Sequence, residues 1–301
     1  MFAKSPGVVA SRSLHARQAR FGFWLVVPAL AAYLLLILVP FGNSVRLAFY
    51  RSTLLAPDPV FRGLENFERL FADGVFIQSW LRTLLFVGAT TTLTVILGIA
   101  WAIILNQGFR GAKVLRSVSL LPWVMPSAVA ALLWAWLLNG QYGVVNAFLI
   151  QAGVLAEPIA WLSHAAGAMT AVVLAKAWLS TALVMTFFLA ALQSLSTDQV
   201  EAARLDGAGN AHVIRYIVLP HLRRTMVVVF VLQAMGNLQQ IDVIYAMTGG
   251  GPVNATSVLS IEVYKTAFQN WNLGRASAIG VIWFLTIAIP ASIYLRSLFK
   301  P

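Results

Sequence analysis

Two long apolar stretches of this chain carry polar side chains at depth, where such groups are costly and usually face a cavity. Lys176 lies near the middle of one stretch, and the other contains Gln233, Asn237, Gln239, Gln240, Asp242 and Tyr245. Amides, a hydroxyl and an acid can hydrogen-bond the hydroxyls of a sugar. The rings of Trp134 and Trp178, in or beside these stretches, can lie under a pyranose face. We therefore treat these residues as candidates for a substrate pathway.

A structural interpretation of the same residues stays open. Amides in an apolar environment also join neighbouring helices by hydrogen bonds, and Lys176 can pair with Asp242. If Lys176 is unpaired and binds the substrate, it favours an anionic sugar, such as a phosphorylated, sulfonated or uronic one.

Other kinds of chemistry find no support in the residue pattern. The chain has no cysteine, and its four histidines show no HExxH motif and no paired-ligand spacing, so we expect neither a disulfide nor a metal site. The segment TGGGPVNAT lacks the Gly-Lys-Ser/Thr of a phosphate-binding loop. We therefore predict no catalytic residue, no metal and no cofactor in this chain.

The composition decides which solvent the chain folds in. Hydrophobic residues make up 59% of the 301 and charged residues only 10%, whereas soluble domains carry about 25% charged residues. A membrane helix needs about 20 apolar residues. Six stretches qualify, so we predict an all-α bundle of six transmembrane helices at residues 21–42, 80–106, 117–138, 165–194, 225–246 and 276–298.

The distribution of Lys and Arg predicts the orientation. Basic residues gather around 4–20, 110–116, 204–224 and 296–300, whereas those on the opposite side are nearly balanced by acids. The basic side is expected to be cytoplasmic, which places both termini inside. The net charge of +11 is then a topology signal, with no nucleic acid required. We predict a cytoplasmic tail at 1–20, a six-helix transmembrane domain at 21–298 and a cytoplasmic end at 299–301.

The longest cytoplasmic loop, at 195–224, has the pattern of two short helices. Asp198 and Glu201 are spaced as in a capping box, and Gly207 can end the first helix. The second helix covers Val213 to Val218, and Pro220 is expected to break it before the fifth membrane helix. The loop can form a protruding knob for a partner protein, or an amphipathic helix at the membrane surface with no partner.

The spacing within this loop resembles a known motif. The residues follow the pattern EAA, three residues, G, nine residues, I, any residue, L, P, which is the EAA loop of the membrane subunits of bacterial binding-protein-dependent ABC importers. In that family the loop couples the membrane subunit to an ATPase. The resemblance assigns this role to Glu201, Ala202, Ala203, Asp206, Gly207, Ile217, Leu219 and Pro220.

Three further segments resemble the carbohydrate-uptake branch of that family: GLENFERLF at 63–71, the segment at 120–149, and YAMTGGGPVNATSVLSIEVYKTAF at 245–268. The last is similar to the larger maltose permease and the first glycerol-phosphate permease, although this chain has six predicted helices where the maltose protein has eight. By analogy, substrate contacts on the fifth helix favour Asn237, Gln240 and Asp242.

The resemblance implies a permease subunit that imports a sugar or sugar derivative, anionic and glycerol-linked ones included, across the bacterial inner membrane. It further implies a homologous second permease, two ATPase subunits that bind ATP and Mg²⁺, and an external solute-binding protein. The alternative is a secondary transporter in which Lys176 and Asp242 couple transport to protons.

Overall fold

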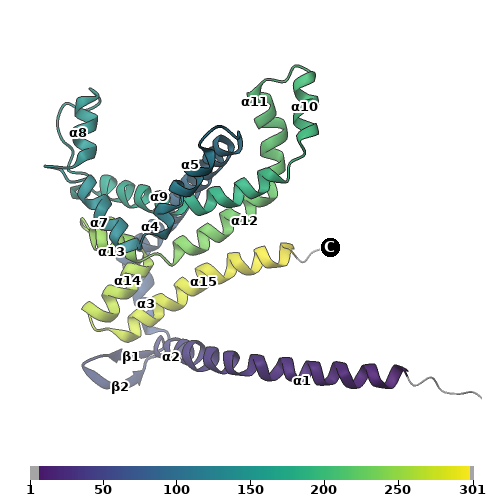
Figure 1. Ribbon diagram of the computed structural model, residues 1–301. Coiled ribbons are helices and arrows are strands. Elements are labelled where there is room, and N and C mark those ends of the chain that lie inside the picture. The colour runs from purple at the N-terminus through teal and green to yellow at the C-terminus, as the bar shows by residue number, and fades with distance from the viewer. Residues whose placement is uncertain (1–6, 299–301) are drawn as a thin grey trace, which may run out of the picture.

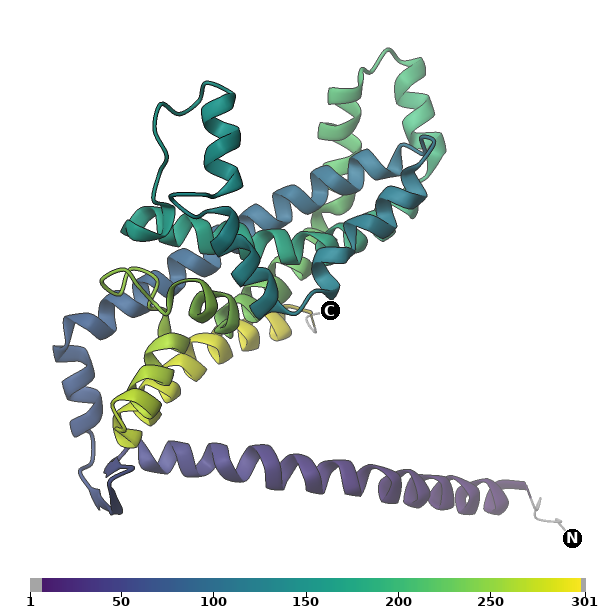
Figure 2. The ribbon, with the colours of Figure 1, turned by 60° about the vertical axis from the view of Figure 1, so that its left-hand side comes forward.

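The computed structural model describes residues 7–298, and its first element is a long helical rod. The rod consists of α1 (Gly7–Tyr33), the π-helical turn η1 (Leu34–Leu38) and α2 (Val39–Leu47). In Figures 1 and 2 it runs away from the other helices, and none of its apolar window is buried. The helix extends into the predicted tail at 1–20. Residues 1–6 of that tail and the predicted end at 299–301 lie outside the described residues.

A small hairpin follows the rod, an addition to the all-α prediction. Strands β1 (Tyr50–Thr53) and β2 (Ala56–Phe61) pair antiparallel, with Tyr50 opposite Phe61. The residues of β2 include Pro57 and Pro59. A proline has no backbone N–H to donate to a neighbouring strand, so it is tolerated in an edge strand such as this one. Helix α3 (Glu65–Ala72) then leads into the bundle.

Two long helices, α4 (Gly74–Asn106) and α9 (Ala165–Gln193), pack side by side at the centre of the bundle. The contact uses small residues: a Cβ added at Gly98 would lie 2.5 Å from Val184 Cγ1. Small residues allow helices to approach closely in lipid, where hydrophobic burial alone does not hold them together. This contact therefore gives the molecule its rigid centre.

The third predicted membrane helix, 117–138, is broken in the structure. It consists of α5 (Ala112–Ser119), α6 (Leu121–Val124) and α7 (Ser127–Leu137), and the chain bends by 99° between Val124 and Ser127. Met125 is extended, as expected for a residue that precedes a proline. Pro126 therefore separates two helices instead of kinking one. The short helices α8 (Val144–Gln151) and η2 (Trp161–Ser163) lead on to α9.

The predicted break at Pro220 is wrong. After α10 (Thr197–Leu205), the elements α11 (Asn210–Val213), the π-helical turn η3 (Ile214–Val218) and α12 (Leu219–Leu238) form one continuous helix. A proline has no N–H for the carbonyl four residues earlier, and its ring crowds that carbonyl. For Pro220 this carbonyl belongs to Tyr216, inside the wider π turn. The same arrangement, with η1 before Pro40, keeps the first rod continuous.

The fifth predicted membrane helix also ends earlier than expected. Helix α12 stops at Leu238, and α13 (Asp242–Thr248) is a separate short helix where the prediction ran on to residue 246. The chain closes with α14 (Leu259–Tyr264), the π-helical turn η4 (Lys265–Gln269) and α15 (Leu273–Leu298).

Among the described residues, four helical stretches are long and apolar enough to cross a membrane, or five if the bent pair counts as one crossing. The apolar part of α15, Leu273–Ile289, is shorter. Each of the six predicted stretches is thus largely helical, and the predicted class of a helical membrane bundle is confirmed.

An ion pair ties the start of α4 to the start of α15. Asp73 caps α4 by accepting a hydrogen bond from the Val75 N–H at 2.9 Å, and Arg275 Nη2 donates to its other carboxylate oxygen. The hydrogen bond from Arg275, helped by the one from Val75, lowers the pKa of Asp73 below its ordinary value of 3.8. The charged carboxylate therefore stabilises the fold at neutral pH.

We predict that Gly98→Ala destabilises the protein by about 1–3 kcal/mol, because the new methyl group overpacks the contact between α4 and α9. Gly88→Ala in the same helix is the matched control, since an added Cβ there has no atom within 4 Å. Thermal denaturation of the purified protein in detergent measures both. Equal melting temperatures for the two variants would contradict the close contact.

Asp73→Asn is expected to lower the melting temperature at pH 7, because the amide keeps the cap but loses the charge that pairs with Arg275. A lowered pKa stabilises the fold above the ordinary value and loses this effect as the pH falls through the lowered one. The difference between wild type and variant should therefore persist down to about pH 4 and shrink below pH 3.8. A difference that is constant across this range would contradict the assignment.

Candidate functional site

Helix α10 is an exposed knob with a well-defined end. Gly207 has φ +86°, its N–H bonds the Arg204 carbonyl at 3.0 Å, and the Ala208 N–H bonds the Ala203 carbonyl at 2.9 Å. This is a Schellman motif, which requires a left-handed residue where Gly207 stands. The predicted capping box is not formed: the N-cap is Ser196, without a side-chain hydrogen bond, and Asp198 lies in the first turn.

The helix after the knob forms its base. Val213, Val218 and Leu222 are buried and pack in one cluster with residues of α4 and α9. His221 Nε2 lies 3.0 Å from the Ala191 carbonyl oxygen, at the end of α9. The base of the loop is thereby attached to the two central helices, and α10 packs on that base through α11.

The eight predicted coupling residues divide between the surface and the base of the knob. Glu201, Ala202, Asp206 and Gly207 are exposed, and Leu205, which the motif does not include, is 90% exposed. Ala202, Ala203, Asp206 and Ile217 line a cavity of about 550 Å³ between the two arms of the loop. Leu219 and Pro220 belong to the first turn of α12.

Two of the predicted pathway residues make contacts between elements. Asn237 is 2% exposed and its Nδ2 donates to Thr91 Oγ1 on α4 at 3.0 Å, while its Oδ1 has no partner among the described residues. Gln240 is buried, and its backbone carbonyl accepts a hydrogen bond from Ser260 Oγ at 2.6 Å. The Asn237 contact fits the structural interpretation of that amide, whereas the bond at Gln240 involves its backbone and not its side-chain amide. Thr91, which accepts the bond from Asn237, is fully buried together with Thr90 and Thr94, and the spacing of these threonines in an apolar helix is a signal that the residue pattern offered.

The two intramembrane charges form no salt bridge. Asp242 is exposed at the start of α13 and accepts a hydrogen bond from Ser127 Oγ on α7 at 2.9 Å. Lys176 is partly buried on α9 and makes no ion pair with any described residue, although Asp242 is close enough for its charge to act on it.

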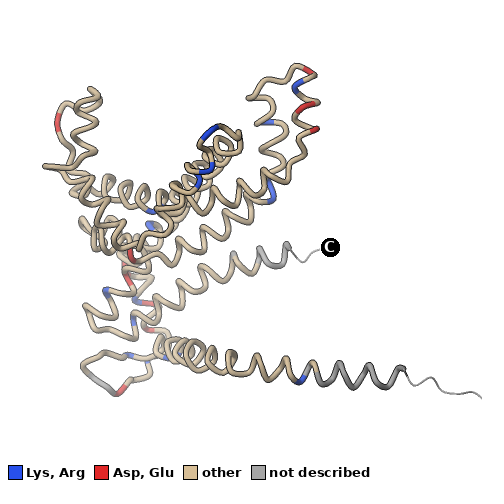
Figure 3. The backbone as a smooth tube through the Cα atoms, viewed as in Figure 1, with Lys and Arg blue, Asp and Glu red and all other residues tan. Residues whose placement is uncertain are grey.

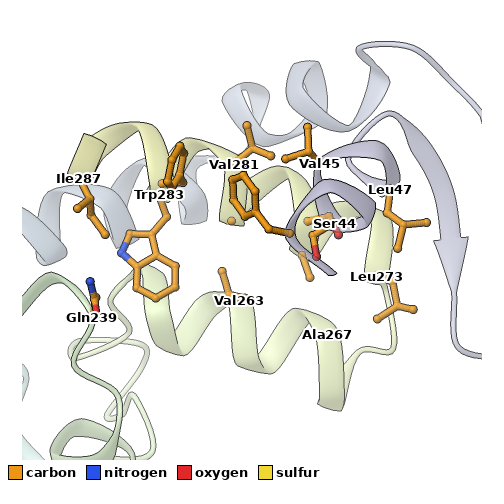
Figure 4. A pocket seen from close by; sticks show the side chains of 15 residues that line it. Ser44, Val45, Leu47, Gln239, Val263, Ala267, Leu273, Val281, Trp283 and Ile287 are labelled. Carbon is orange, nitrogen blue, oxygen red and sulfur yellow. The ribbon is translucent and has the colours of Figure 1, made fainter. Parts of the chain in front are cut away.

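The predicted aromatic residues lie at two places. The rings of Trp134 and Trp178 meet edge to face, with centroids 6.0 Å apart, and line a cavity of about 400 Å³ whose wall comes mainly from α4 and α9. Tyr245 meets Tyr264 at 5.0 Å. Gln239 faces a third region, an apolar cavity of about 690 Å³ next to α2 and α15 (Figure 4). A single chain thus does not bring the eight pathway candidates into one site.

Known proteins resemble this chain over most of its length. A family described as "Binding-protein-dependent transport system inner membrane component" matches residues 94–300. The trehalose/maltose transport system permease protein MalF of Thermococcus litoralis is 33% identical over 283 residues, which cover 93% of this chain and 94% of that protein. The sulfoquinovosyl glycerol transport system permease protein SmoG of Agrobacterium fabrum is 31% identical over 273 residues, with 90% and 88% covered.

The fold is also found among solved structures. A chain of a bacterial ABC transporter involved in the import of the acidic polysaccharide alginate superimposes with a TM-score of 0.78 at 21% identity. The match covers 96% of this chain and 100% of that one. The arrangement of helices is therefore shared well beyond sequence similarity.

Gly207→Val is expected to destabilise the end of α10 by about 1–3 kcal/mol, because a β-branched residue is strained at positive φ. The matched control is Gly209→Val, two residues on, where φ is −72° and an added Cβ meets no atom within 4 Å. Hydrogen exchange of residues 197–208 measures the effect. Faster exchange in the Gly209 variant than in the Gly207 variant would contradict the role of Gly207.

Proposed function

Because the chain belongs to the family of binding-protein-dependent transport system inner membrane components, we propose that it is the sugar-translocating permease subunit of an ATP-driven importer. Members of this family are transport permeases and not enzymes. The relatives named for trehalose/maltose and for sulfoquinovosyl glycerol support a sugar or sugar derivative as the substrate.

The observation that carries the coupling role is the knob at α10. It combines an exposed helix, a rigid glycine end and a base attached to α4 and α9. In the proposal, α10 sits in a groove of a partner ATPase subunit, and closure of the two ATPases around ATP moves the knob. ATP can shift the equilibrium between the inward- and outward-facing states of the importer only if it binds to one of these states more tightly than to the other.

A homologous second permease is proposed to complete the membrane part. The rod formed by α1 and α2 exposes its whole apolar window, and the apolar cavity of about 690 Å³ lies where α2 meets α15 (Figure 4). Part of the lining of this cavity consists of small residues, namely Ser44, Ala267, Ala276 and Gly280. Small residues allow another helix to approach closely. The pathway candidates of the two permeases would then face each other across a shared cavity.

The orientation is proposed from the charges. Figure 3 shows Lys and Arg around α5 and along the helices α10 to α12, at one end of the long helices. By the positive-inside rule this end is cytoplasmic, which places the hairpin, α8 and the segment 249–258 outside. This orientation puts α10 where an ATPase that uses cytoplasmic ATP can reach it, and places both termini inside.

Reconstitution of the whole importer tests the function. The chain is co-purified with its second permease and ATPase subunits, placed in proteoliposomes, and assayed for ATP hydrolysis and sugar uptake with and without the binding protein. We expect both activities to rise with the binding protein, and Gly207→Val to reduce both. Uptake that persists without any ATPase would contradict the proposal and favour the secondary transporter.

Lys176→Met tests whether this unpaired cation selects the substrate. If Lys176 binds an anionic group, the variant should transport the anionic substrate at least about tenfold less well, a loss expected for a charged hydrogen bond in a buried site. Transport of a neutral analogue should change little. Ser180→Ala, one turn further along the same face of α9, serves as a control. An unchanged preference between the two sugars would refute the role of Lys176.

A further inference from the structure

A cavity of about 610 Å³ opens at the end of the bundle that holds the segment 249–258. Its wall includes Arg82 and Leu85 of α4, His164 and Met169 at the start of α9, and Pro252 and Val253. Helix α4 has 33 residues and is therefore about 50 Å long, against about 30 Å of hydrocarbon. Arg82 lies within its first nine residues, so in the proposed orientation the cavity is near the outer membrane surface.

The charge in this cavity is not compensated. Arg82 is partly buried, and its Nη2 donates to the neutral Gln78 Oε1 at 2.8 Å. Its Nη1 is buried and has no acceptor among the described residues. None of the residues lining the cavity is acidic, and Arg82 takes part in none of the ion pairs of the described chain. A guanidinium in this position is costly until an anion approaches it.

The segment beside the cavity is held rigidly. Thr256 is fully buried, and its Oγ1 bonds Thr248 Oγ1 at 2.6 Å and the Gly251 carbonyl at 2.9 Å. These bonds hold Val253 with φ +43° and 95% exposed. A β-branched residue at positive φ is strained, and such strain persists only where the surrounding bonds enforce it. The structure thus fixes an apolar side chain in solvent at the rim of a cationic cavity.

We propose that this cavity receives the carboxylate of an Asp or Glu side chain of the external binding protein, with Val253 packed against the apolar surface next to that acid. A protein surface explains both features together, because it supplies an anion for Arg82 and covers Val253. A lipid headgroup or a free anion would occupy the cavity and leave Val253 in water. His164 adds a second group that can donate a hydrogen bond to the carboxylate. The inference rests on the proposed function, which requires a binding protein.

The test uses the complete importer in nanodiscs and the fluorescently labelled binding protein, and measures the Kd between them. Arg82→Gln is expected to weaken binding by about tenfold or more, since a buried charge pair loses one partner. Val253→Ser should weaken it less and leaves the cavity charge in place. The control is Arg69→Gln, an exposed arginine that already pairs with Glu65, with an expected change below about twofold, as for an exposed pair.

Two further arms identify the anion. Replacing one acidic residue of the binding protein by lysine should restore binding to Arg82→Glu, which a lipid could not do. The Kd measurements are repeated in phosphatidylcholine with and without phosphatidylglycerol, and the loss in Arg82→Gln should be equal in both. A loss that appears only with phosphatidylglycerol would overturn the proposal in favour of a headgroup site.

Size-exclusion chromatography checks that each variant complex elutes at the same volume as the wild-type complex, so that misassembly is recognised. The inference is overturned if the Kd is unchanged in both Arg82→Gln and Val253→Ser although the binding protein still stimulates ATP hydrolysis by the wild-type complex. If the wild-type complex itself is not stimulated, the proposed function fails instead.

Discussion

The contact between α4 and α9 is the constraint on which the rest of the structure depends. In lipid there is no hydrophobic driving force between two apolar helices, so van der Waals contacts between closely packed small residues have to hold them together. Gly98 provides this closeness at Val184, and Thr91 of α4 accepts a hydrogen bond from Asn237 on α12. Three long helices thereby become one body, to which the knob at one end and the outer cavity at the other are both attached.

In the proposed function, this body lets the membrane subunit transmit movement that is driven by a partner protein. The base of α10 packs into the same cluster as α4 and α9, and the cavity at Arg82 is built on the opposite ends of those two helices. In the proposed function, binding events at these two ends act on one rigid element. Coupling of this kind requires that each partner prefers one of two states of that element.

Hydropathy alone predicts the six helical stretches because lipid leaves the backbone no alternative to the helix. The glycine-ended turn at Gly207 is likewise local, since a left-handed residue at that position needs no distant contact. Two other local features escape the same reasoning. The helix is broken at Pro126 but continues through Pro220, because a π turn before Pro220 accommodates the proline. No residue pattern that we recognise predicts this π turn. The partners of Asn237 and Asp242 depend on helix packing, which one sequence does not specify.

Cross-linking at the tip of α10 tests the central claim most directly. The chain contains no cysteine, so Leu205→Cys, at a position that is 90% exposed, carries a unique thiol, and Leu55→Cys on the hairpin, 76% exposed, is the control. With a short cysteine-to-lysine cross-linker in native membranes, we expect Leu205→Cys to join the ATPase subunit and Leu55→Cys not to. A Leu205 variant that reacts only with a soluble thiol reagent, and with no ATPase, would contradict the account.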